Sequence, residues 1–347
     1  MVSVGIVGAS GYTGAELLRL CAAHPSFEVK LATGDSQAGS RITELYPSLA
    51  GAYGGETFAE YDPAIVDGLD LVFLALPHGA SQALAPELLG RVGAIVDLAA
   101  DFRLADPGLY PTWYGEEHKR PEMLSEFVYG LPELFRDTIQ GASAVAAPGC
   151  YVTAASLALA PLLQHGLIEP KGMVVDAASG VSGAGRPPKA TTSFCTVDED
   201  FTAYGLLDHR HTPEIEQTLS RLVPDASAQV LFTPHLAPMS RGILATCYAR
   251  PAAGKTSGTD DLLAVLDQAW ADEPFVVVSD RPPSTKATLG SNTVHVTALA
   301  DPRTGWVMAL AALDNLVKGA SGQAVQCANL MLDLPETTGL TTTGLYP

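Results

Sequence analysis

The sequence has few cysteines, few aromatic residues and little positive charge. Its five cysteines, at positions 21, 150, 195, 247 and 327, are odd in number and widely spaced. They form no C-x-x-C pair or Cys/His group of the kind found in disulfide frameworks and zinc sites, so we expect neither disulfides nor a bound metal. With 20 Lys and Arg against 38 Asp and Glu, the net charge is −18. Such a charge disfavours nucleic acid and other polyanionic partners.

Long hydrophobic runs are also missing. No apolar stretch reaches the roughly 18 residues that a membrane-spanning helix needs. The first residues, Met1 to Val7, have the pattern of a strand and lack the basic region of a signal peptide. A hydrophobic content of 47% with 17% charged residues is typical of a globular protein. We therefore expect a cytoplasmic protein of about two domains, with no membrane partner.

The first half of the chain alternates apolar strands with amphipathic helical patterns. Strands are expected at Val2–Val7, Phe27–Thr33, Leu69–Leu76, Gly93–Leu98 and Ser143–Ala147, and helices at Thr13–Ala23 and Ser81–Gly90. Short strands that are almost wholly apolar indicate a parallel sheet covered on both faces. This half is predicted to be a doubly wound α/β domain.

The second half has a different pattern, with many strands and few helices. Six strands are expected, at Met173–Ser179, Gln229–Pro234, Gly242–Arg250, Phe275–Ser279, Thr293–Ala300 and Gly305–Leu313. They indicate a mixed or antiparallel sheet in an α+β domain. The apolar spacing of Asn315–Leu332 predicts a helix that returns to the first domain.

A glycine-rich segment, Gly8 to Gly14, lies between the first strand and the first helix. Glycines at this position let the backbone approach a pyrophosphate at the helix N-terminus. The spacing G-x-x-G-x-x-G departs from G-x-G-x-x-G, and a tight turn without a nucleotide is the alternative interpretation. We predict a dinucleotide-binding loop.

The end of the second strand carries polar residues where an adenosine ribose would lie. Asp35 is suited to a ribose 2′-hydroxyl, as in NAD sites, whereas Ser36, Ser40 and Arg41 are suited to a 2′-phosphate. Four solvated loop residues are the alternative. The pattern favours NADP.

Cys150 follows a Pro148–Gly149 turn and opens an Ala- and Leu-rich helical segment. The unpaired N–H groups and partial positive charge of a helix N-terminus favour a thiolate, and they offer donors to a neighbouring oxyanion. A cysteine at such a junction can also be a small packed hydrophobe. Cys150 is the candidate nucleophile.

Asp208 to Ile215 holds His209, His211 and Glu214 in a stretch that enters a helix. A histidine can hydrogen-bond a thiol or protonate a developing oxyanion, and an imidazole beside a thiolate is a recurrent way of activating cysteine. Solvent-facing histidines are the alternative. The pattern does not decide which of the two histidines has the catalytic role.

Two further loops carry candidate groups. Ser179–Arg186 is rich in small residues, so its amides can approach a phosphate or a nicotinamide. Arg103, after the fourth strand, is a candidate clamp for an anion or else the partner of a neighbouring aspartate. An acidic protein with an anionic substrate needs basic groups near its site, and Arg186 and Arg241 are further candidates.

Seven segments distributed along nearly the whole chain carry a family resemblance. They are Gly8–Gly14, Ala75–Gly79, Asp101–Leu104, Pro148–Tyr151, Ser179–Arg186, His209–Glu214 and Asp314–Gly319. In this order they resemble the N-acetyl-γ-glutamyl-phosphate reductases of arginine biosynthesis. The resemblance implies an NADP-binding Rossmann domain (1–149 with 315–347) and an α+β catalytic and dimerisation domain (150–314). Both would be of the semialdehyde and glyceraldehyde-3-phosphate dehydrogenase type.

The resemblance also implies residue roles. Cys150 would be the nucleophile and His209 the acid/base, assisted by Glu214, with Arg103 and His211 on the substrate side. NADP(H) would contact Gly8, Ser10, Gly11, Tyr12, Thr13, Gly14, Ser36, Arg41, Ser182, Gly183 and Asn292.

The implied reaction is NADPH-dependent reduction of N-acetyl-L-glutamyl 5-phosphate to the 5-semialdehyde and phosphate through a Cys150 thioester, in a homo-oligomer (dimer or tetramer). The sister reductase of the carrier-protein lysine route, which acts on an aminoadipyl phosphate, is the first alternative, but its cysteine motif lacks Pro148 and Tyr151. Aspartate-semialdehyde dehydrogenase is more distant, because its histidine motif differs. A non-enzymatic NADP-sensing regulator would have no reason to combine Cys150 with a histidine cluster.

Overall fold

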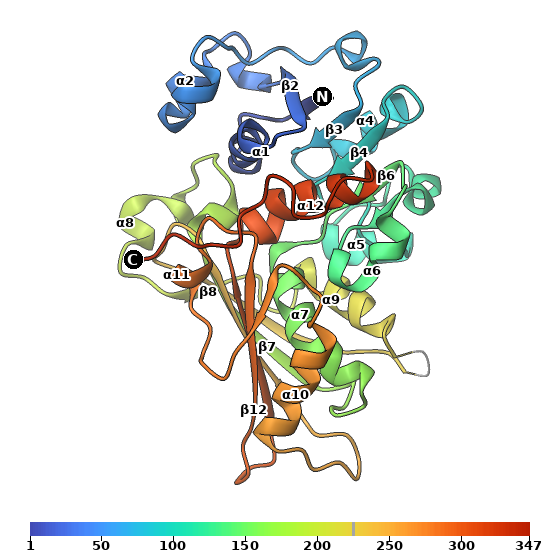
Figure 1. Cartoon of the computed structure of the whole chain (residues 1–347), viewed down its shortest axis with the longest axis vertical. Coiled ribbons are helices and arrows are strands. Elements are labelled where there is room, and N and C mark those ends of the chain that lie inside the picture. Colours follow the sequence, from blue (N-terminus) through green and yellow to red (C-terminus); the bar gives the residue numbers. More distant parts are fainter. Residues whose placement is uncertain (224–225) are drawn as a thin grey trace. The chain divides into compact units, whose positions relative to one another are not determined.

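A computed structural model describes residues 1–223 and 226–347 of the chain (Figure 1). The chain divides into two compact units. The first unit comprises Met1–Gly108, Glu116–Pro148 and Ala320–Leu340, and the second comprises Leu109–Gly115, Gly149–Gly319 and Thr341–Pro347. Each unit contains one β-sheet, and each is described below by itself.

The first unit contains a six-stranded sheet in the order β2-β1-β3-β4-β6-β5. Its strands are β1 (Val2–Val7), β2 (Phe27–Ala32), β3 (Leu71–Leu74), β4 (Ala94–Asp97), β5 (Val128–Tyr129) and β6 (Ala144–Ala146). All neighbouring strands pair in parallel. Every residue of β3, β4 and β6 is buried, so both faces of the centre of the sheet are covered. The predicted α/β domain with a parallel sheet is confirmed.

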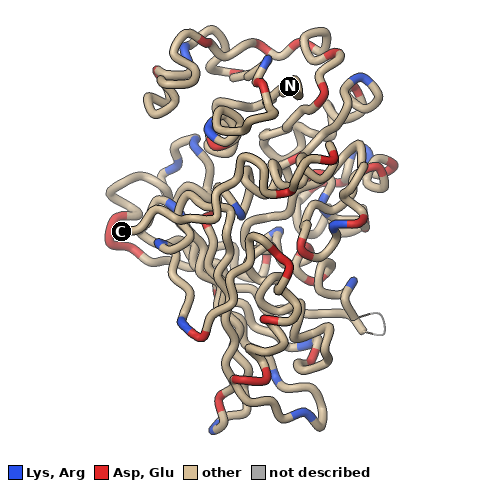
Figure 2. Tube along the Cα trace, in the orientation of Figure 1, with Lys and Arg blue, Asp and Glu red and all other residues tan. Residues whose placement is uncertain are grey.

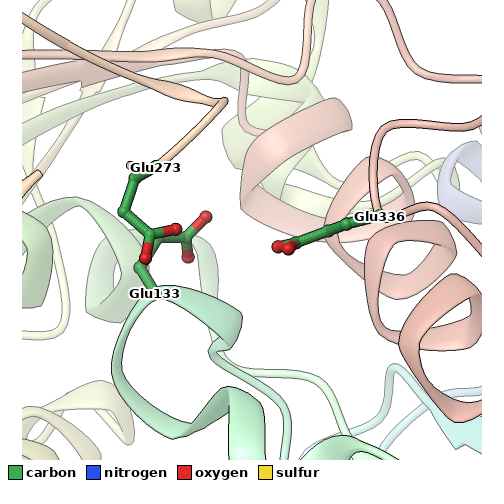
Figure 3. Close-up of side chains that lie close together, drawn as sticks. All are labelled: Glu133, Glu273 and Glu336. Atoms are coloured by element: carbon green, nitrogen blue, oxygen red, sulfur yellow. The ribbon is translucent and has the colours of Figure 1, made fainter. Parts of the chain in front are cut away.

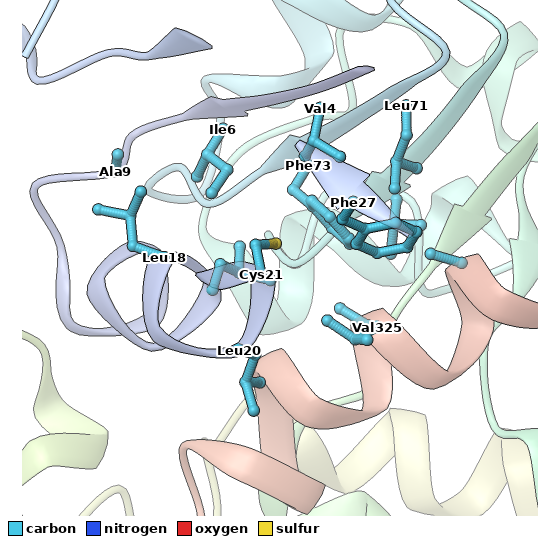
Figure 4. Close-up of a cluster of buried hydrophobic side chains, with 14 of the residues drawn as sticks. Val4, Ile6, Ala9, Leu18, Leu20, Cys21, Phe27, Leu71, Phe73 and Val325 are labelled. Atoms are coloured by element: carbon cyan, nitrogen blue, oxygen red, sulfur yellow. The ribbon is translucent and has the colours of Figure 1, made fainter. Parts of the chain in front are cut away.

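Six α-helices belong to the first unit. They are α1 (Tyr12–Ala23), α2 (Ile42–Leu45), α3 (Ala50–Tyr53), α4 (Ser81–Leu88), α6 (Pro132–Ile139) and α12 (Gly322–Met331). Helix α12 packs against α1, α6 and β4, so the last helix returns to the first unit as predicted. Figure 4 shows Val325 of α12 in one apolar cluster with Cys21 of α1 and Phe73 of β3.

The second unit contains a seven-stranded mixed sheet in the order β11-β12-β13-β10-β7-β9-β8. Its strands are β7 (Met173–Gly180), β8 (Thr202–Ala203), β9 (Val230–Ala237), β10 (Ile243–Ala249), β11 (Val276–Val278), β12 (Val294–Ala300) and β13 (Val307–Leu313). The β7–β9 and β11–β12 pairs are parallel and the others antiparallel. The six predicted strands are present. The two-residue β8 is an addition, because it is too short to leave an alternation pattern.

The second unit has six α-helices within its described residues. They are α5 (Tyr110–Tyr114), α7 (Cys150–Gln164), α8 (Phe194–Val197), α9 (His211–Ser220), α10 (Thr259–Ala269) and α11 (Thr285–Thr288). Helices α7, α9 and α10 pack on the sheet. Buried and half-buried residues alternate along β7 and β10, as expected when helices cover only one face.

Charged residues are spread along the trace of both units, and Figure 2 shows acidic positions in loops throughout the chain. The net charge of −18 is therefore distributed over many loops, not concentrated in one acidic run. Among the described residues, no helix has both the length and the apolar character needed to cross a bilayer.

Candidate active site in the second unit

Cys150 is the first residue of α7, directly after the N-cap Gly149. No side chain caps this helix, and its first turn contains no acidic residue. The backbone N–H groups of the first turn therefore have no side-chain cap. Two glycines permit the close packing here: a Cβ on Gly149 would overlap the His211 ring, and a Cβ on Gly319 would lie 2.7 Å from the Cys150 Cβ.

The other cysteines lie in different environments. Cys21, Cys247 and Cys327 are buried, and burial raises the pKa of the Cys21 and Cys247 thiols to about 12. Such thiols carry almost no thiolate at neutral pH. Cys195 is exposed, whereas Cys150 is partly exposed at a helix N-terminus. Cys150 is thus the cysteine whose position is suited to nucleophilic chemistry.

Glu214 lies in the first turn of α9 and is fully buried. Its Oε1 accepts a hydrogen bond of 2.9 Å from the backbone N–H of Gly149. A carboxylate from α9 therefore fixes the turn that precedes Cys150. Sequence reasoning placed Glu214 beside His209, but the geometry connects it to the backbone of the cysteine turn.

His209 is enclosed by aromatic rings. The ring centroids of Tyr151, Tyr204 and Phe232 lie 5.8, 5.5 and 5.2 Å from its imidazole. Its Nδ1 accepts a hydrogen bond of 3.1 Å from the backbone N–H of His211. Burial, and then the charge of Arg210, lower the pKa of His209 to about 4. His209 is therefore neutral near pH 7.

His211 is 7% exposed, and its ring lies against Gly149 and 5.8 Å from the Tyr151 ring. The centroids of His209 and His211 are 4.8 Å apart. The structure thus brings Cys150, His209, His211 and Glu214 together around one turn. The solvent-facing alternative is wrong for His211, which is buried against Gly149. His209 is half-buried, with the Tyr151 ring beside it.

Two tyrosines extend this cluster. The Tyr204 hydroxyl donates to the Tyr151 hydroxyl (3.1 Å), which in turn donates to the carbonyl of His235 (3.2 Å). Burial raises the pKa of Tyr204 to about 12, and the neighbouring Cys150 adds to this shift. Sequence analysis did not identify Tyr204, because its partner Tyr151 lies 53 residues away and no local motif links them.

The predicted cofactor loops of this unit are joined through Asp314 and Asn315. Asn315 donates to Ser182 Oγ (3.0 Å) and accepts from the N–H of Gly242 (2.8 Å). Asp314 accepts from the N–H of Gly290 (2.8 Å). Gly183 would place a Cβ 2.9 Å from Ser179 Oγ, and Asn292 is fully buried with its N–H bonded to the Thr341 carbonyl. Asp314 and Asn315 were noted in the sequence only as part of a motif.

The predicted helix from Asn315 begins differently from the expectation. The residues Val317–Ser321 form a π-helix, and α12 starts only at Gly322. The Asp314 carboxylate accepts from the N–H groups of Leu316 and Val317, and Gly319 must approach Cys150 closely. These constraints account for the irregular start.

Predicted cofactor and substrate residues in the first unit

The glycine loop is shaped by close backbone contacts. Gly8 has a φ of 87°, and a Cβ there would overlap the Ala75 carbonyl. A Cβ on Gly14 would lie 2.5 Å from the Ala9 Cα. Gly11 is the N-cap of α1, which has neither a side-chain cap nor an acidic residue in its first turn. This helix N-terminus fits the pyrophosphate of a dinucleotide.

Hydrogen bonds from other residues stabilise the conformation of the Gly8–Gly14 loop. Ser10 is buried, and its hydroxyl donates to the Gly34 carbonyl (3.1 Å), while the Thr13 carbonyl accepts from Ser321 (2.8 Å). Tyr12, the first residue of α1, is 36% exposed.

Ser36 and Arg41 follow β2. Ser36 lies in a 3₁₀ turn, Asp35–Gln37, in which Asp35 has a φ of 45°. Arg41 is exposed and its backbone pairs with Thr57. An exposed guanidinium beside a tight turn suits the 2′-phosphate of NADP.

Arg103 is 9% exposed and donates to the carbonyl of Leu98 (2.8 Å). Its charge acts on the buried carboxyl of Asp97, and the buried Asp101 precedes it by two residues. Burial opposes ionisation of Asp101, but His78 and the Gly79 N–H outweigh it and hold its pKa below the ordinary value. Burial raises the pKa of Asp97 to about 7.

Two carboxylates of this unit share one amide donor. The Gln326 amide donates to Glu133 (3.0 Å) and to Glu336 (2.7 Å), and Arg136 pairs with Glu336 (3.0 Å). Figure 3 shows Glu133 and Glu336 among their neighbouring elements. Arg136 offsets the charge of Glu336, and the Gln326 amide satisfies one oxygen of each carboxylate.

Comparisons with known proteins

Two family descriptions match the chain. Residues 3–142 match "Semialdehyde dehydrogenase, NAD binding domain", and residues 150–315 match "Semialdehyde dehydrogenase, dimerisation domain". Together they cover most of the chain and meet near the Cys150 turn.

Curated relatives match over full length. The chain is 50% identical over 350 residues to the N-acetyl-gamma-glutamyl-phosphate reductase of Desulforudis audaxviator, covering 100% of both chains. It is 49% identical over 352 residues to the same-named protein of Symbiobacterium thermophilum, covering 100% of this chain and 99% of the relative.

Solved structures of similar fold are aspartate semialdehyde dehydrogenases. The structure from Vibrio cholerae, described as complexed with ASA, has a TM-score of 0.71 at 17% identity, covering 96% of this chain and 98% of that one. A structure from Candida albicans, described as with NADP, has a TM-score of 0.71 at 15% identity, covering 96% and 99%. They confirm the predicted pairing of an α/β unit with a mixed-sheet unit.

Proposed function

This chain belongs to the N-acetyl-gamma-glutamyl-phosphate reductase family, and on that premise we propose what it does. It reduces N-acetyl-L-glutamyl 5-phosphate to N-acetyl-L-glutamate 5-semialdehyde and phosphate, using NADPH and a thioester on Cys150. This reaction is the third step of arginine biosynthesis.

The observation that carries the proposal is the construction of the Cys150 turn. Cys150 begins α7 behind an uncapped glycine, and the buried Glu214 holds that glycine by its N–H. The helix dipole favours the thiolate, and the N–H groups of the first turn are donors for an oxyanion on a carbonyl attacked by the sulfur.

The chemistry of the chain's own groups follows in two stages. The Cys150 thiolate attacks the acyl carbon, the bond from that carbon to the phosphate oxygen breaks, and phosphate leaves with its electron pair. The thioester that remains is electrophilic. NADPH, when bound, supplies the hydride that reduces this carbonyl. Cleavage of the C–S bond then releases the aldehyde and restores the Cys150 thiolate.

The first unit supplies most of the proposed cofactor contacts. Gly8, Ser10, Gly11, Tyr12, Thr13 and Gly14 form the loop at the N-terminus of α1, and Ser36 and Arg41 are assigned to the 2′-phosphate. Ser182, Gly183 and Asn292 of the second unit are assigned to the nicotinamide side. The proposed cofactor domain is residues 1–149 with 315–347, and the proposed catalytic domain is residues 150–314.

On the substrate side we assign Arg103 to the anionic groups of the acyl phosphate and His211 to the wall beside the Cys150 turn. The guanidinium of Arg103 is nearly buried, which strengthens its attraction for an anion. The His211 ring packs on Gly149, which supports a role next to the reacting sulfur.

The direct test is the reverse reaction. Purified protein is supplied with NADP, phosphate and N-acetylglutamate semialdehyde, and NADPH is followed by its absorbance. Phosphate-dependent turnover that disappears in Cys150→Ser supports both the reaction and the nucleophile. Phosphate-independent turnover, or unchanged turnover in Cys150→Ser, would contradict them.

Parallel substrates decide between the alternatives. Aspartate semialdehyde and the carrier-linked aminoadipate semialdehyde are tested beside the acetylated substrate under the same conditions. Preference for either would assign the chain to that reductase type. NADP binding without turnover on any of the three would favour a non-enzymatic sensor.

We also propose that the protein is a cytoplasmic homodimer, formed through the sheet face of the second unit that α7, α9 and α10 leave open, or a tetramer containing this dimer. Half-buried apolar residues lie on the strands at alternate positions, among them Val174, Leu244, Tyr248 and Met308. The description of residues 150–315 as a dimerisation domain supports a second copy as the partner. A two-fold arrangement places the same apolar face of each copy in contact.

A further inference from the structure

Arg241 lies in the connection between β9 and β10. Strand β7 is between these two strands in the sheet, so the connection passes the end of β7. Its backbone is fixed there, because the N–H of Gly180 donates to the carbonyl of Gly242 at 2.9 Å. A Cβ on Gly180 would lie 2.7 Å from the backbone nitrogen of Arg241. The glycine therefore brings Arg241 against the start of the Ser179–Arg186 loop.

The guanidinium of Arg241 is held by a buried carboxylate. Its Nη1 lies 3.6 Å from Oδ2 of Asp314, whose side chain is fully buried, whereas the Arg241 side chain is 30% exposed. A guanidinium presents several N–H donors in one plane, and their spacing matches the two oxygens of a carboxylate. Arg241 is thus an oriented cation that a small anion can reach from solvent.

Asp314 also holds the segment that packs on Cys150. Its Oδ1 accepts a hydrogen bond of 2.9 Å from the N–H of Leu316, at the entry to the π-helix, and its carbonyl accepts one of 2.9 Å from the N–H of Gly319. A Cβ on Gly319 would lie 2.7 Å from the Cys150 Cβ. One residue therefore fixes both the Arg241 guanidinium and the turn against the nucleophile.

We propose that Arg241 binds the α-carboxylate of the acyl-phosphate substrate, and that Asp314 is a positioning residue that fixes this anchor relative to the Cys150 sulfur. The proposal rests on the proposed function and specifies how its substrate is selected. The α-carboxylate does not react, so a fixed anchor for it orients the acyl carbon toward the sulfur. In a protein with a net charge of −18, the anchor also offsets repulsion of an anionic substrate.

The other candidate arginines have different contacts. Arg103 belongs to the first unit and donates to the carbonyl of Leu98, and this proposal leaves the phosphoryl group to it. Arg186 has a buried Nε that makes no hydrogen bond within residues 1–223 and 226–347. Arg241 shares Asp314 with the turn at Cys150, which favours it as the anchor. Arg186 is the alternative that the experiments must separate from it.

The first experiment removes the carboxylate from the substrate. In the reverse reaction, N-acetylglutamate semialdehyde is compared with 4-acetamidobutanal, which is the same aldehyde without the α-carboxylate. Because a hydrogen bond to a charged group contributes about 10- to 100-fold, wild type should prefer the carboxylated aldehyde by this factor in kcat/KM. Equal kcat/KM for the two aldehydes would overturn the proposal.

The second experiment removes the anchor. In Arg241→Gln the preference should fall to about threefold or less, because glutamine carries no charge. Arg241→Lys keeps a counterion for Asp314 but loses the planar fork, so it controls for misfolding and should show an intermediate preference. Arg303→Gln, at a side chain that is 83% exposed, is the matched control and should keep the wild-type preference. A wild-type preference in Arg241→Gln would overturn the proposal.

Two further measurements test other roles for these arginines. If Arg186→Gln loses the preference and Arg241→Gln keeps it, the anchor is Arg186 and the proposal is wrong. The KM for phosphate should change by less than about twofold in Arg241→Gln. A rise of about tenfold in that KM, with an unchanged preference between the aldehydes, would assign Arg241 to phosphate and overturn the proposal.

The Asp314→Asn variant tests the positioning role. Asparagine keeps one acceptor oxygen but no charge, so it cannot hold both the Arg241 guanidinium and the turn at Cys150. We expect kcat/KM for the carboxylated aldehyde to fall more than kcat/KM for 4-acetamidobutanal, which reduces the preference. A purely structural role would lower both values equally. An unchanged preference would therefore remove Asp314 from the proposal.

The last experiment does not depend on turnover. The two aldehydes are titrated by calorimetry into Cys150→Ser and into the double variant that also carries Arg241→Gln. Tighter binding of the carboxylated aldehyde by Cys150→Ser, lost in the double variant, supports the anchor, and equal binding by Cys150→Ser would overturn it. If wild type turns over neither aldehyde but this difference in binding is present, the proposed function fails and the anchor stands.

Discussion

The two sheets of this protein bury their residues in different ways. In the first unit β3, β4 and β6 are buried at every position, whereas β7 and β10 of the second unit alternate between buried and half-buried residues. Continuous burial means that the first unit covers its own sheet on both faces. Alternation means that the helices of the second unit cover only one face of its sheet. The other face is available to contact another protein surface. The comparison predicts that substitutions in the first unit change cofactor binding alone. Substitutions in the second unit should change covalent chemistry and assembly alone.

The sharpest separation is at the nucleophile. Replacing Cys150 by Ser should lower turnover at least about 1,000-fold, because a hydroxyl at this position is a far weaker nucleophile than a thiolate. The affinity for NADPH, measured by quenching of protein fluorescence, should change by less than about twofold. Cys195→Ser, at an exposed cysteine, is the matched control and should keep full turnover. A parallel loss of NADPH affinity in Cys150→Ser would contradict the separate roles of the two units.

A substitution in the glycine loop, Gly8 to Gly14, should instead affect the binding of NADPH. Gly8→Ala introduces a Cβ at a φ of 87° against the Ala75 carbonyl, whereas Gly11→Ala meets only the Gly8 carbonyl at 3.6 Å. We expect Gly8→Ala to lose about 1–3 kcal/mol of stability and to bind NADPH about 10- to 100-fold more weakly. Gly11→Ala should retain stability.

Calorimetry and fluorescence titration measure these two effects. Alkylation of Cys150 by iodoacetamide should proceed at the wild-type rate in folded Gly8→Ala. A changed alkylation rate would show that the two units do not act separately.

The open sheet face is tested by Leu244→Asp. A carboxylate on this half-buried apolar strand position should weaken the dimer about 100-fold or more, because burying an unpaired charge in an interface is costly. Light scattering after size-exclusion chromatography measures the mass. Thr256→Asp, at an exposed loop position, is the control for the added negative charge. A Leu244→Asp protein with the wild-type mass would exclude this face as the interface.

The smallest effect is expected in the core of the first unit. Burial raises the pKa of Asp97 from 3.8 to about 7, so the folded state holds this proton more tightly than the unfolded state does. The stabilisation from that proton is complete below pH 3.8 and is lost as the pH rises through 7. Wild type should therefore lose stability as the pH rises from about 4 to 7, between the unfolded and folded pKa values of Asp97, and Asp97→Asn should lose less. Melting temperatures across this range, with the exposed Asp272→Asn as control, measure the difference.

Sequence reasoning recovered the fold where a single local pattern determines it. The apolar run of β3 and the alternation of β10 are visible in a few consecutive residues, and both strands were predicted within about two residues. The strands β5 and β8 have two residues each and leave no period to detect. The π-helix at Val317–Ser321 follows from packing against Cys150, which no local pattern encodes.

The candidate site was recovered in part for the same reason. Cys150, His209 and His211 have side-chain chemistry that identifies them, and their motifs are local. The contact of Glu214 with the Gly149 backbone spans 65 residues, and that of Tyr204 with Tyr151 spans 53. Such distant pairs depend on how α7, α9 and β9 pack together. The residue types were therefore predictable, whereas the contacts that set their roles were not.

The hydrogen bond from Gly149 to Glu214 also bears on how this protein is made. The turn before Cys150 is complete only when α9 has docked, and its packing is complete only when Gly319 has arrived. During synthesis, a ribosome that has just finished α7 therefore displays an ordinary thiol. We therefore expect the reactive form to appear only after Gly319 has been synthesised, near the end of translation.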